Sequence, residues 1–294
     1  MEKQNLKNFV EKKNFVFLLL SLLIIVVLII FLVLKKQKDS KNAKIIPPEN
    51  LKDVIVIYKA IYKLEDIVPV ECKSVLPVAY TKVISLSKLP VEEKKKKFID
   101  IVLPSILVAN FRIEQKRKEI LKIKSKIEEG KEISLSEAKF LDKLLEQYKA
   151  ESIDQLLIRL NTHPVSLILA QAAIESGWGE SKFFVKGNNV FGMWTWDKKR
   201  KEKIRASKNK NVYLKKYRNI LESVEDYLYS LNVSWAYKNF RLARLRYDNS
   251  LLLSNYLEKY STLRKRYVER IKTIIKSNNL QKYDYCKINP DFIY

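Results

Sequence analysis

The amino-acid sequence predicts a mainly helical protein that is attached to a membrane by one N-terminal helix. Three observations support this prediction. An uncharged apolar run occupies residues 15–34, apolar residues recur at helical spacing from residue 51 to about 160, and the 294-residue chain contains only five glycines. So few glycines make collagen, Gly/Ser-rich linkers and Gly-rich phosphate loops unexpected, because an average protein has ~7% glycine.

The apolar run at residues 15–34 has one polar residue, Ser21, and is long enough to cross a bilayer. A helix of this length spans ~30 Å, which is the thickness of the hydrocarbon core. A cleaved signal peptide is the alternative. Its apolar region usually has ~7–15 residues and ends at small residues, whereas this run ends in the lysine-rich segment 35–38. We therefore predict an uncleaved transmembrane anchor.

Lysine-rich segments flank the predicted anchor on both sides. Residues 1–14 form a basic N-terminal flank with four lysines, and five lysines follow the anchor by residue 44. The positive-inside rule alone leans slightly toward a cytoplasmic C-terminal side. Residues 35–50 are polar, end in two prolines and are typical of a linker. The remaining residues form the body of the protein.

The first part of the body, residues 51–150, is predicted to be a helical region. Residues 95–127 repeat lysine, glutamate, isoleucine and leucine at helical spacing, and Pro104 is expected to kink this helix or to split it in two. Two capping boxes then predict helices at 135–149 and 153–160. Their paired residues are Ser134 with Glu137, and Ser152 with Gln155.

The second part of the body, residues 151–294, contains a helix that is apolar around most of its circumference. It is predicted to begin at Pro164 and to stop before Gly177, and such a helix must be buried. Glu175 lies at its C-terminal end, where lost hydration and the helix dipole both raise the pKa of a carboxyl group. A general acid for glycosidic cleavage requires such a pKa. The alternative is a glutamate at an exposed helix end.

The segment after this helix is rich in glycine and aromatic residues. Four of the five glycines lie between residues 177 and 196, which indicates special backbone geometry. Aromatic rings beside a carboxylate suit stacking on sugars, although we expect most rings of this segment to be core residues.

The ordered motif from Ala170 to Phe183, continued from Gly187 to Trp194, resembles the glucosaminidase domain of glycoside hydrolase family 73. Within that family the sequence is most similar to the bacterial Bax-type proteins. The similarity extends over roughly residues 90–290 and is strongest over 150–275. The resemblance implies a lysozyme-like helical fold with a small β-lobe over the cleft. It also implies hydrolysis of the β-1,4 bond after N-acetylglucosamine in peptidoglycan.

The resemblance further implies the residues of the site. The catalytic acid of the family corresponds to Glu175, and its active-site tyrosine corresponds to Tyr260, whose hydroxyl would position a sugar or a water. The alternative for Tyr260 is a core tyrosine at a helix start. Contacts with substrate are expected from a further set of residues, which are Gln171, Asn188, Asn189, Trp194 and Tyr217.

The sequence does not assign a second catalytic carboxylate. Asp197 and Glu202 are the two acids of residues 197–218. An inverting enzyme needs its two carboxyl groups ~6.5–9.5 Å apart and a retaining enzyme ~5–5.5 Å apart. Attack by the 2-acetamido group of the substrate would need neither residue, so Asp197, Glu202 and no second carboxylate all stay open.

Histidine and cysteine are scarce in this chain. One histidine and two cysteines exclude His₂, His₃ and four-thiolate metal sites, so neither a metal nor a cofactor is expected. His163 precedes the buried helix, and we expect it to cap that helix or to face solvent. Whether Cys72 and Cys286 pair is left open.

The formal net charge of +24 indicates an anionic partner. Residues 197–218 carry eleven basic residues and two acidic ones, and we expect them to meet carboxylates of peptidoglycan. Nucleic acid is not expected, because no nucleic-acid-binding motif occurs.

The sequence therefore predicts a single-pass protein of the cytoplasmic (inner) membrane that acts on peptidoglycan glycan strands from the periplasmic, cell-wall side. Two alternatives on the same fold stay open. One is a noncatalytic wall-binding or scaffold protein, and the other is a muramidase or lytic transglycosylase.

Overall fold

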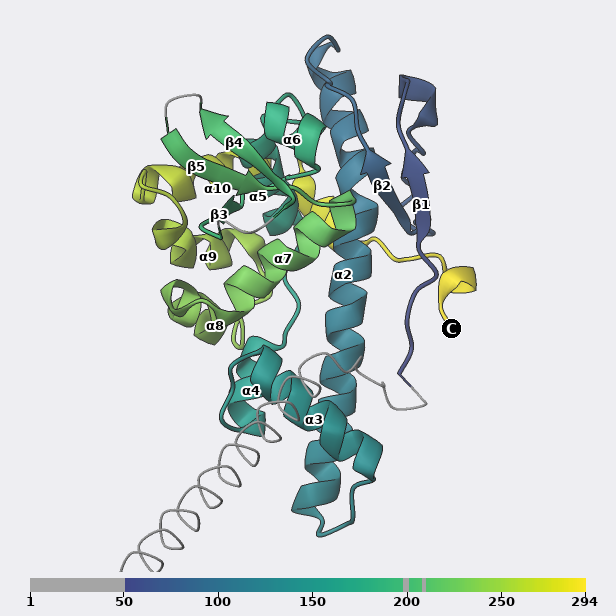
Figure 1. Cartoon of the computed structure of the whole chain (residues 1–294), viewed down its shortest axis with the longest axis vertical. Coiled ribbons are helices and arrows are strands. Elements are labelled where there is room, and N and C mark those ends of the chain that lie inside the picture. The colour runs from purple at the N-terminus through teal and green to yellow at the C-terminus, as the bar shows by residue number, and fades with distance from the viewer. Residues whose placement is uncertain (1–50, 198–200, 208–209) are drawn as a thin grey trace, which may run out of the picture. The chain divides into compact units, whose positions relative to one another are not determined.

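A computed structural model describes residues 51–197, 201–207 and 210–294. The predicted basic flank, anchor and linker at residues 1–50 lie outside the described residues and stay predictions. Within the described ranges, no helix combines the length and the apolar character that crossing a bilayer requires. This part of the chain is mainly helical with two small sheets, as the sequence predicted (Figure 1).

The helices and strands follow one another as Figure 1 shows. The α-helices are α2 (Val91–Glu128), α3 (Leu135–Gln147), α4 (Ile153–Arg159), α5 (Val165–Ser176), α6 (Lys182–Gly187), α7 (Ile220–Val233), α8 (Lys238–Ala243), α9 (Ser250–Ser254) and α10 (Lys265–Ser277). The strands are β1 (Ile57–Ala60), β2 (Val78–Lys82), β3 (Trp194–Thr195), β4 (Lys203–Ser207) and β5 (Lys210–Lys215). Short 3₁₀ helices are η1 (Leu64–Asp66), η2 (Trp235–Tyr237), η3 (Asn255–Tyr260), η4 (Leu280–Tyr285) and η5 (Pro290–Phe292).

The long helix α2 runs through the body as one element of 38 residues. Two outcomes were predicted at Pro104, and the split is wrong, because the helix continues through this residue. The kink stays a prediction. A proline inside a helix costs about 3 kcal/mol. Residues 98–109 are all buried, and α2 contacts α5, α7 and β2. Burial of this apolar stretch offsets the cost of Pro104.

Residues 51–90 contain no α-helix and only the short 3₁₀ helix η1, which corrects the first part of the predicted helical region 51–150. Strands β1 and β2 pair in parallel, with Ile57 opposite Val78, and β2 contacts α2. Isoleucine, valine and tyrosine dominate residues 54–58, and such residues favour strands. Residues before and after position 150 pack together, so the described chain forms one compact unit.

The two helices predicted from capping boxes, α3 and α4, are confirmed. The Ser134 hydroxyl accepts from the Glu137 N–H at 3.2 Å, and the Glu137 carboxylate accepts from the Ser134 N–H at 2.8 Å. Ser152 caps α4 by accepting from the Gln155 N–H at 3.2 Å. The Gln155 side chain accepts from the Glu151 N–H at 2.7 Å, so this second box is shifted by one residue.

His163 is buried beside Arg244, so the predicted capping or solvent-facing role is wrong. Its Nε2 lies 3.1 Å from the Asn232 Oδ1 and 2.8 Å from an Arg244 nitrogen, and its ring stacks on Phe240. Burial and the charge of Arg244 lower the pKa of His163. Arg244 also donates to the carbonyl groups of Ile158 and Arg159, which lie at the C-terminal end of α4. This network is therefore structural, because the arginine satisfies carbonyl groups that the helix leaves free.

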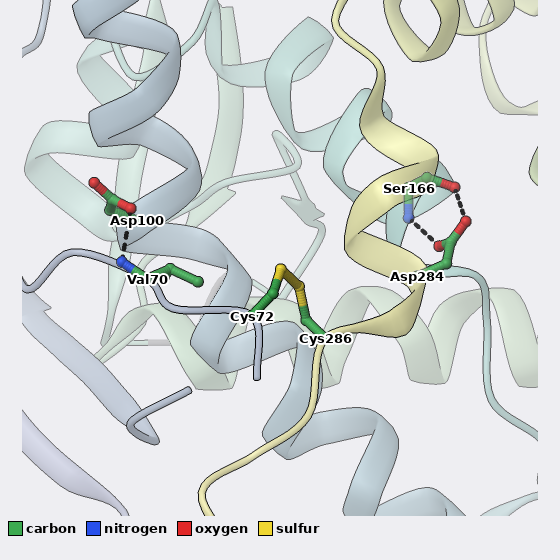
Figure 2. The surroundings of a disulfide bond; sticks show 6 residues. All are labelled: Val70, Cys72, Asp100, Ser166, Asp284 and Cys286. Carbon is green, nitrogen blue, oxygen red and sulfur yellow. Dashed lines mark hydrogen bonds between the residues drawn. A yellow bond between two sulfur atoms is a disulfide. The ribbon is translucent and has the colours of Figure 1, made fainter. Parts of the chain in front are cut away.

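The C-terminal segment is joined to the start of the described chain. Cys72 and Cys286 form a disulfide, which Figure 2 shows. Beyond it, the Tyr294 carbonyl accepts from the Asp53 N–H, and the Tyr294 N–H donates to the Asp53 carbonyl, both at 3.1 Å. The last nine residues are thus held by one covalent bond and by backbone hydrogen bonds.

The same segment also fixes the beginning of α5. Both carboxylate oxygens of Asp284 accept from Ser166, one from its N–H and one from its hydroxyl, each at 2.7 Å (Figure 2). Ser166 lies in the first turn of α5, where N–H groups lack helical partners and a carboxylate complements the helix dipole. Asp284 therefore stabilises one end of the helix whose other end carries Glu175.

Candidate active site

Helix α5 is buried along most of its length, as the sequence predicted. Residues 165–173 are all buried, and α5 contacts α2 and α10. The helix ends where Gly177 adopts a left-handed conformation with φ of 60°, which favours glycine. Glu175 occupies the last turn and is half-buried.

The environment of Glu175 favours the protonated form of its carboxyl group. Burial raises the pKa of Glu175, and this effect exceeds the opposing effects of a hydrogen bond from Tyr267 and the charge of Arg270. The upward direction agrees with the expectation from the sequence. A carboxyl group that keeps its proton at higher pH is suited to act as a general acid.

A directed chain of hydrogen bonds ends on the Glu175 carboxylate. The Tyr227 hydroxyl donates to the Gln171 side-chain oxygen, and the Gln171 amide donates to the Tyr267 oxygen at 3.0 Å. The Tyr267 hydroxyl then donates to the Glu175 Oε1 at 2.8 Å. Each member therefore strengthens the next donor toward Glu175.

Gln171 occupies the middle of this chain and is fully buried. Its amide is used by two tyrosine hydroxyls, so the structure places Gln171 behind the site and not on a surface that substrate touches. Its role here is to orient Tyr267.

Tyr260 stacks on Tyr267, with ring centroids 5.4 Å apart and an interplanar angle of 11°. Its hydroxyl lies 3.4 Å from the Phe191 carbonyl, whereas the hydroxyl bonded to Glu175 belongs to Tyr267. The role that the resemblance implies for Tyr260 stays a prediction. Tyr267 was missed as a site residue, although it lies one turn before Arg270 on α10 and both act on Glu175.

Three of the expected substrate contacts are buried and hold the small β-lobe together. Asn189 donates to the Lys215 carbonyl at 2.8 Å, and Asn188 donates to the Tyr217 carbonyl at 3.1 Å. The Tyr217 hydroxyl donates to Asp226. These polar side chains connect the loop after α6 to β5 and α7. Their hydrogen bonds therefore stabilise the lobe.

The β-lobe itself is a three-stranded antiparallel sheet in the order β3–β5–β4, which confirms the expected small sheet. Trp194 is 52% exposed and stacks near Trp196, which is 80% exposed. Trp194 is therefore accessible to a ligand. Asp197 and Glu202 are exposed in the same lobe, and the choice between them or neither as a second catalytic group stays a prediction.

A separate pocket of about 800 Å³ lies at the opposite, N-terminal end of α5. Its lining includes His163, Arg244 and Asp284 but not Glu175. Two of these polar groups already bind protein atoms. Arg244 donates to a carbonyl group at the end of α4, and Asp284 accepts from Ser166. Among residues 51–197, 201–207 and 210–294, no three His, Cys, Asp or Glu side chains are grouped to hold a metal ion.

Comparison with protein families places this site in a known domain. Residues 150–280 match the glucosaminidase family model, whose description is mannosyl-glycoprotein endo-β-N-acetylglucosaminidase. These residues form a glucosaminidase-family domain. The glucosaminidase domain includes Glu175, Gln171, Tyr227 and Tyr267, which are the members of the hydrogen-bond chain.

Two curated proteins are similar to the glucosaminidase domain and its surroundings. Over 159 residues the chain is 31% identical to Protein bax of Escherichia coli, covering 51% of this chain and 55% of that protein. Over 141 residues it is 29% identical to the exo-glucosaminidase LytG of Bacillus subtilis, covering 42% of this chain and 47% of that protein. The chain thus spans about half the length of the curated relatives it matches.

Two solved structures are also similar to the chain. The catalytic domain of the autolysin Auto from Listeria monocytogenes is 20% identical with a TM-score of 0.37, covering 67% of this chain and 89% of that chain. The glycoside hydrolase domain of FlgJ from Salmonella typhimurium is 24% identical with a TM-score of 0.32, covering 48% of this chain and 89% of that chain.

Proposed function

We propose that this protein is a peptidoglycan hydrolase that cleaves the β-1,4 bond after N-acetylglucosamine, with Glu175 as the general acid. One observation carries the proposal. A glucosaminidase-family domain holds a half-buried carboxyl group whose pKa is raised by burial and whose carboxylate accepts a hydrogen bond from Tyr267.

The geometry suggests how the proton would move. Glu175 gives its proton to the glycosidic oxygen while the bond from that oxygen to the N-acetylglucosamine C1 breaks and its electron pair stays on the oxygen. The Tyr267 hydroxyl, already 2.8 Å from Glu175, stabilises the carboxylate that remains. Asp197, Glu202 or the 2-acetamido group of the substrate supports the positive charge at C1. A water then adds to C1, and the proton that it loses restores the acid form of Glu175.

We further propose that residues 15–34 tether the body on the periplasmic, cell-wall side of the cytoplasmic membrane. The Cys72–Cys286 disulfide supports this location, because disulfides persist mainly in oxidising compartments. The eleven basic residues of segment 197–218 add support, since a basic lobe attracts the carboxylates of the wall.

Product analysis tests the reaction. The purified full chain is incubated with peptidoglycan, and the fragments are reduced with borohydride and identified by mass spectrometry. We expect N-acetylglucosamine at the reduced ends. Reduced muramic acid ends would indicate a muramidase, and anhydro-muramic ends would indicate a lytic transglycosylase. Wall binding without any cleavage products would favour the noncatalytic alternative.

The Tyr267→Phe substitution is expected to move the alkaline limb of the pH–rate profile to higher pH. The lost hydrogen bond stabilises the charged form of Glu175, so its removal raises the pKa of Glu175 and keeps the acid protonated at higher pH. The measurement is kcat/KM on peptidoglycan as a function of pH. Tyr229→Phe is the matched control, because its hydroxyl donates to the Gln147 carbonyl and not to a group of the site. Equal profiles for the two variants would contradict this role of Tyr267.

A further inference from the structure

Trp235 is a large aromatic side chain on the surface of the glucosaminidase domain. It lies in η2, between α7 and α8, and is 80% exposed. Single exposed apolar residues are common on protein surfaces. The neighbours of Trp235 therefore decide whether its exposure has a function.

The position of Trp235 connects it to the surroundings of Glu175. Helix η2 contacts η3, and the ring of Tyr237 lies 6.2 Å from the ring of Tyr260. Tyr260 stacks in turn on Tyr267, which donates to Glu175. Burial, and to a smaller extent the charge of Glu175, raise the pKa of Tyr237 to about 12. Trp235 is two residues before Tyr237 in the same short helix, so η2 connects it to the residues around Glu175.

The ammonium group of Lys259 lies over the Trp235 ring. The Lys259 Nζ lies 5.1 Å from the centroid of the Trp235 ring, and Lys259 immediately precedes Tyr260 in the chain. Both side chains are exposed, and Lys259 forms no ion pair with a carboxylate among the residues that the structure describes. The ammonium group therefore lies over one face of an indole ring that stays 80% exposed.

We propose that Trp235 and Lys259 form a substrate-binding subsite for anionic glycan. The indole stacks on a sugar ring, and the ammonium group pairs with a carboxylate of the same strand. This inference rests on the proposed function, because peptidoglycan carries such carboxylates on its stem peptides and on the lactyl groups of muramic residues that lack a peptide. A polymer of N-acetylglucosamine alone carries none, so the subsite selects peptidoglycan over neutral glycan.

Binding measured without turnover tests the subsite. The Glu175→Gln protein is the parent, and dissociation constants are measured for three ligands. They are peptide-bearing glycan strands, peptide-free strands that keep the lactyl carboxylate, and N-acetylglucosamine oligomers. Trp235→Ala and Lys259→Gln are introduced separately into this parent. The matched controls are Tyr62→Ala and Lys82→Gln, because the Lys82 Nζ lies 4.2 Å over the exposed Tyr62 ring beside the two-stranded sheet.

Trp235→Ala is expected to weaken binding of all three ligands by about tenfold, because each ligand loses an aromatic ring that its sugar covers in the complex. Trp235→Phe keeps a flat ring and is expected to restore most of this loss. Lys259→Gln is expected to weaken only the charged strands, by about three- to tenfold, and to reduce the salt dependence of their binding. Loss on the peptide-free strands alone identifies the lactyl carboxylate, because in peptide-bearing strands that carboxyl group is an amide. Loss on peptide-bearing strands alone identifies a carboxylate of the stem peptide, and loss on both shows that the ammonium group pairs with either one.

Several results would overturn the subsite. One is a Glu175→Gln parent that binds none of the ligands. Another is a Trp235→Ala protein that binds them as tightly as Tyr62→Ala. The third is a Lys259→Gln protein whose affinity for neutral oligomers falls as much as its affinity for charged strands. Failure of the proposed reaction would appear in the product analysis, as the absence of N-acetylglucosamine ends after digestion by the unmodified chain. The two failures are therefore distinguishable.

Discussion

Replacing Glu175 with glutamine is expected to lower the rate of glycan cleavage by about 10²–10⁴-fold, because an amide has no acidic proton to give. The variant is expected to stay folded, since glutamine has the same shape and its oxygen can still accept from Tyr267. Burial raises the pKa of Glu175 in the folded protein, so the carboxylate costs stability at a pH above its unfolded pKa. Removing that charge is expected to leave the melting temperature at neutral pH unchanged or higher.

The measurement is the initial rate at which new reducing ends appear in purified peptidoglycan. Glu180→Gln is the matched control, because Glu180 lies five residues further along the chain, is exposed and pairs with Lys94. We expect this control to keep the original rate. A Glu175→Gln protein that cleaves as fast as the control would exclude Glu175 as the acid.

Removing the Cys72–Cys286 disulfide is expected to destabilise the body by about 2–5 kcal/mol. The two cysteines are 214 residues apart, so the bond restricts the unfolded chain strongly. For a domain of this size, the loss lowers the melting temperature by roughly 5–15 °C. The contact of Asp284 with Ser166 is expected to loosen as well, because Asp284 is two residues from Cys286.

Thermal unfolding of the Cys72→Ser/Cys286→Ser double variant measures this effect. The unmodified chain is compared with it in the presence and absence of a thiol reductant. The reductant is expected to lower the melting temperature of the unmodified chain and to leave that of the double variant unchanged. Equal melting temperatures for the two oxidised proteins would show that the disulfide adds no stability.

The sequence predicted the helices that carry strong local signals. The Ser134 capping box and the apolar run of α5 specify their helices through residues that are close in the chain. The split predicted at Pro104 is wrong because the free-energy cost of a proline inside the helix is offset by packing against α5, α7 and β2. The residues of these elements are distant from Pro104 in sequence, so the local pattern does not reveal them. The strands β1 and β2 were missed because each is short and their pairing joins residues about twenty positions apart.

The candidate site was predicted in part for the same reason. The burial of Glu175 and the upward direction of its pKa could be predicted, because Glu175 belongs to the apolar helix that causes both. Tyr267 could not be distinguished from Tyr260 by sequence, since the two stack together and only the fold determines which hydroxyl reaches the carboxyl group. The buried amides of Gln171, Asn188 and Asn189 are similar cases, because a polar residue type does not reveal whether it faces substrate or protein.

The junction between the two ends of the body has a consequence for how the chain assembles. Ribosomes deliver a protein from its N-terminus, so Asp53 and Cys72 are made long before Tyr294 and Cys286 are available to meet them. The two cysteines are 214 residues apart, and contacts between residues so distant in sequence form slowly. We therefore expect the body to reach its final state only after Tyr294 has been synthesised, and the segment from Cys286 to Tyr294 to be the last part of the body to become ordered.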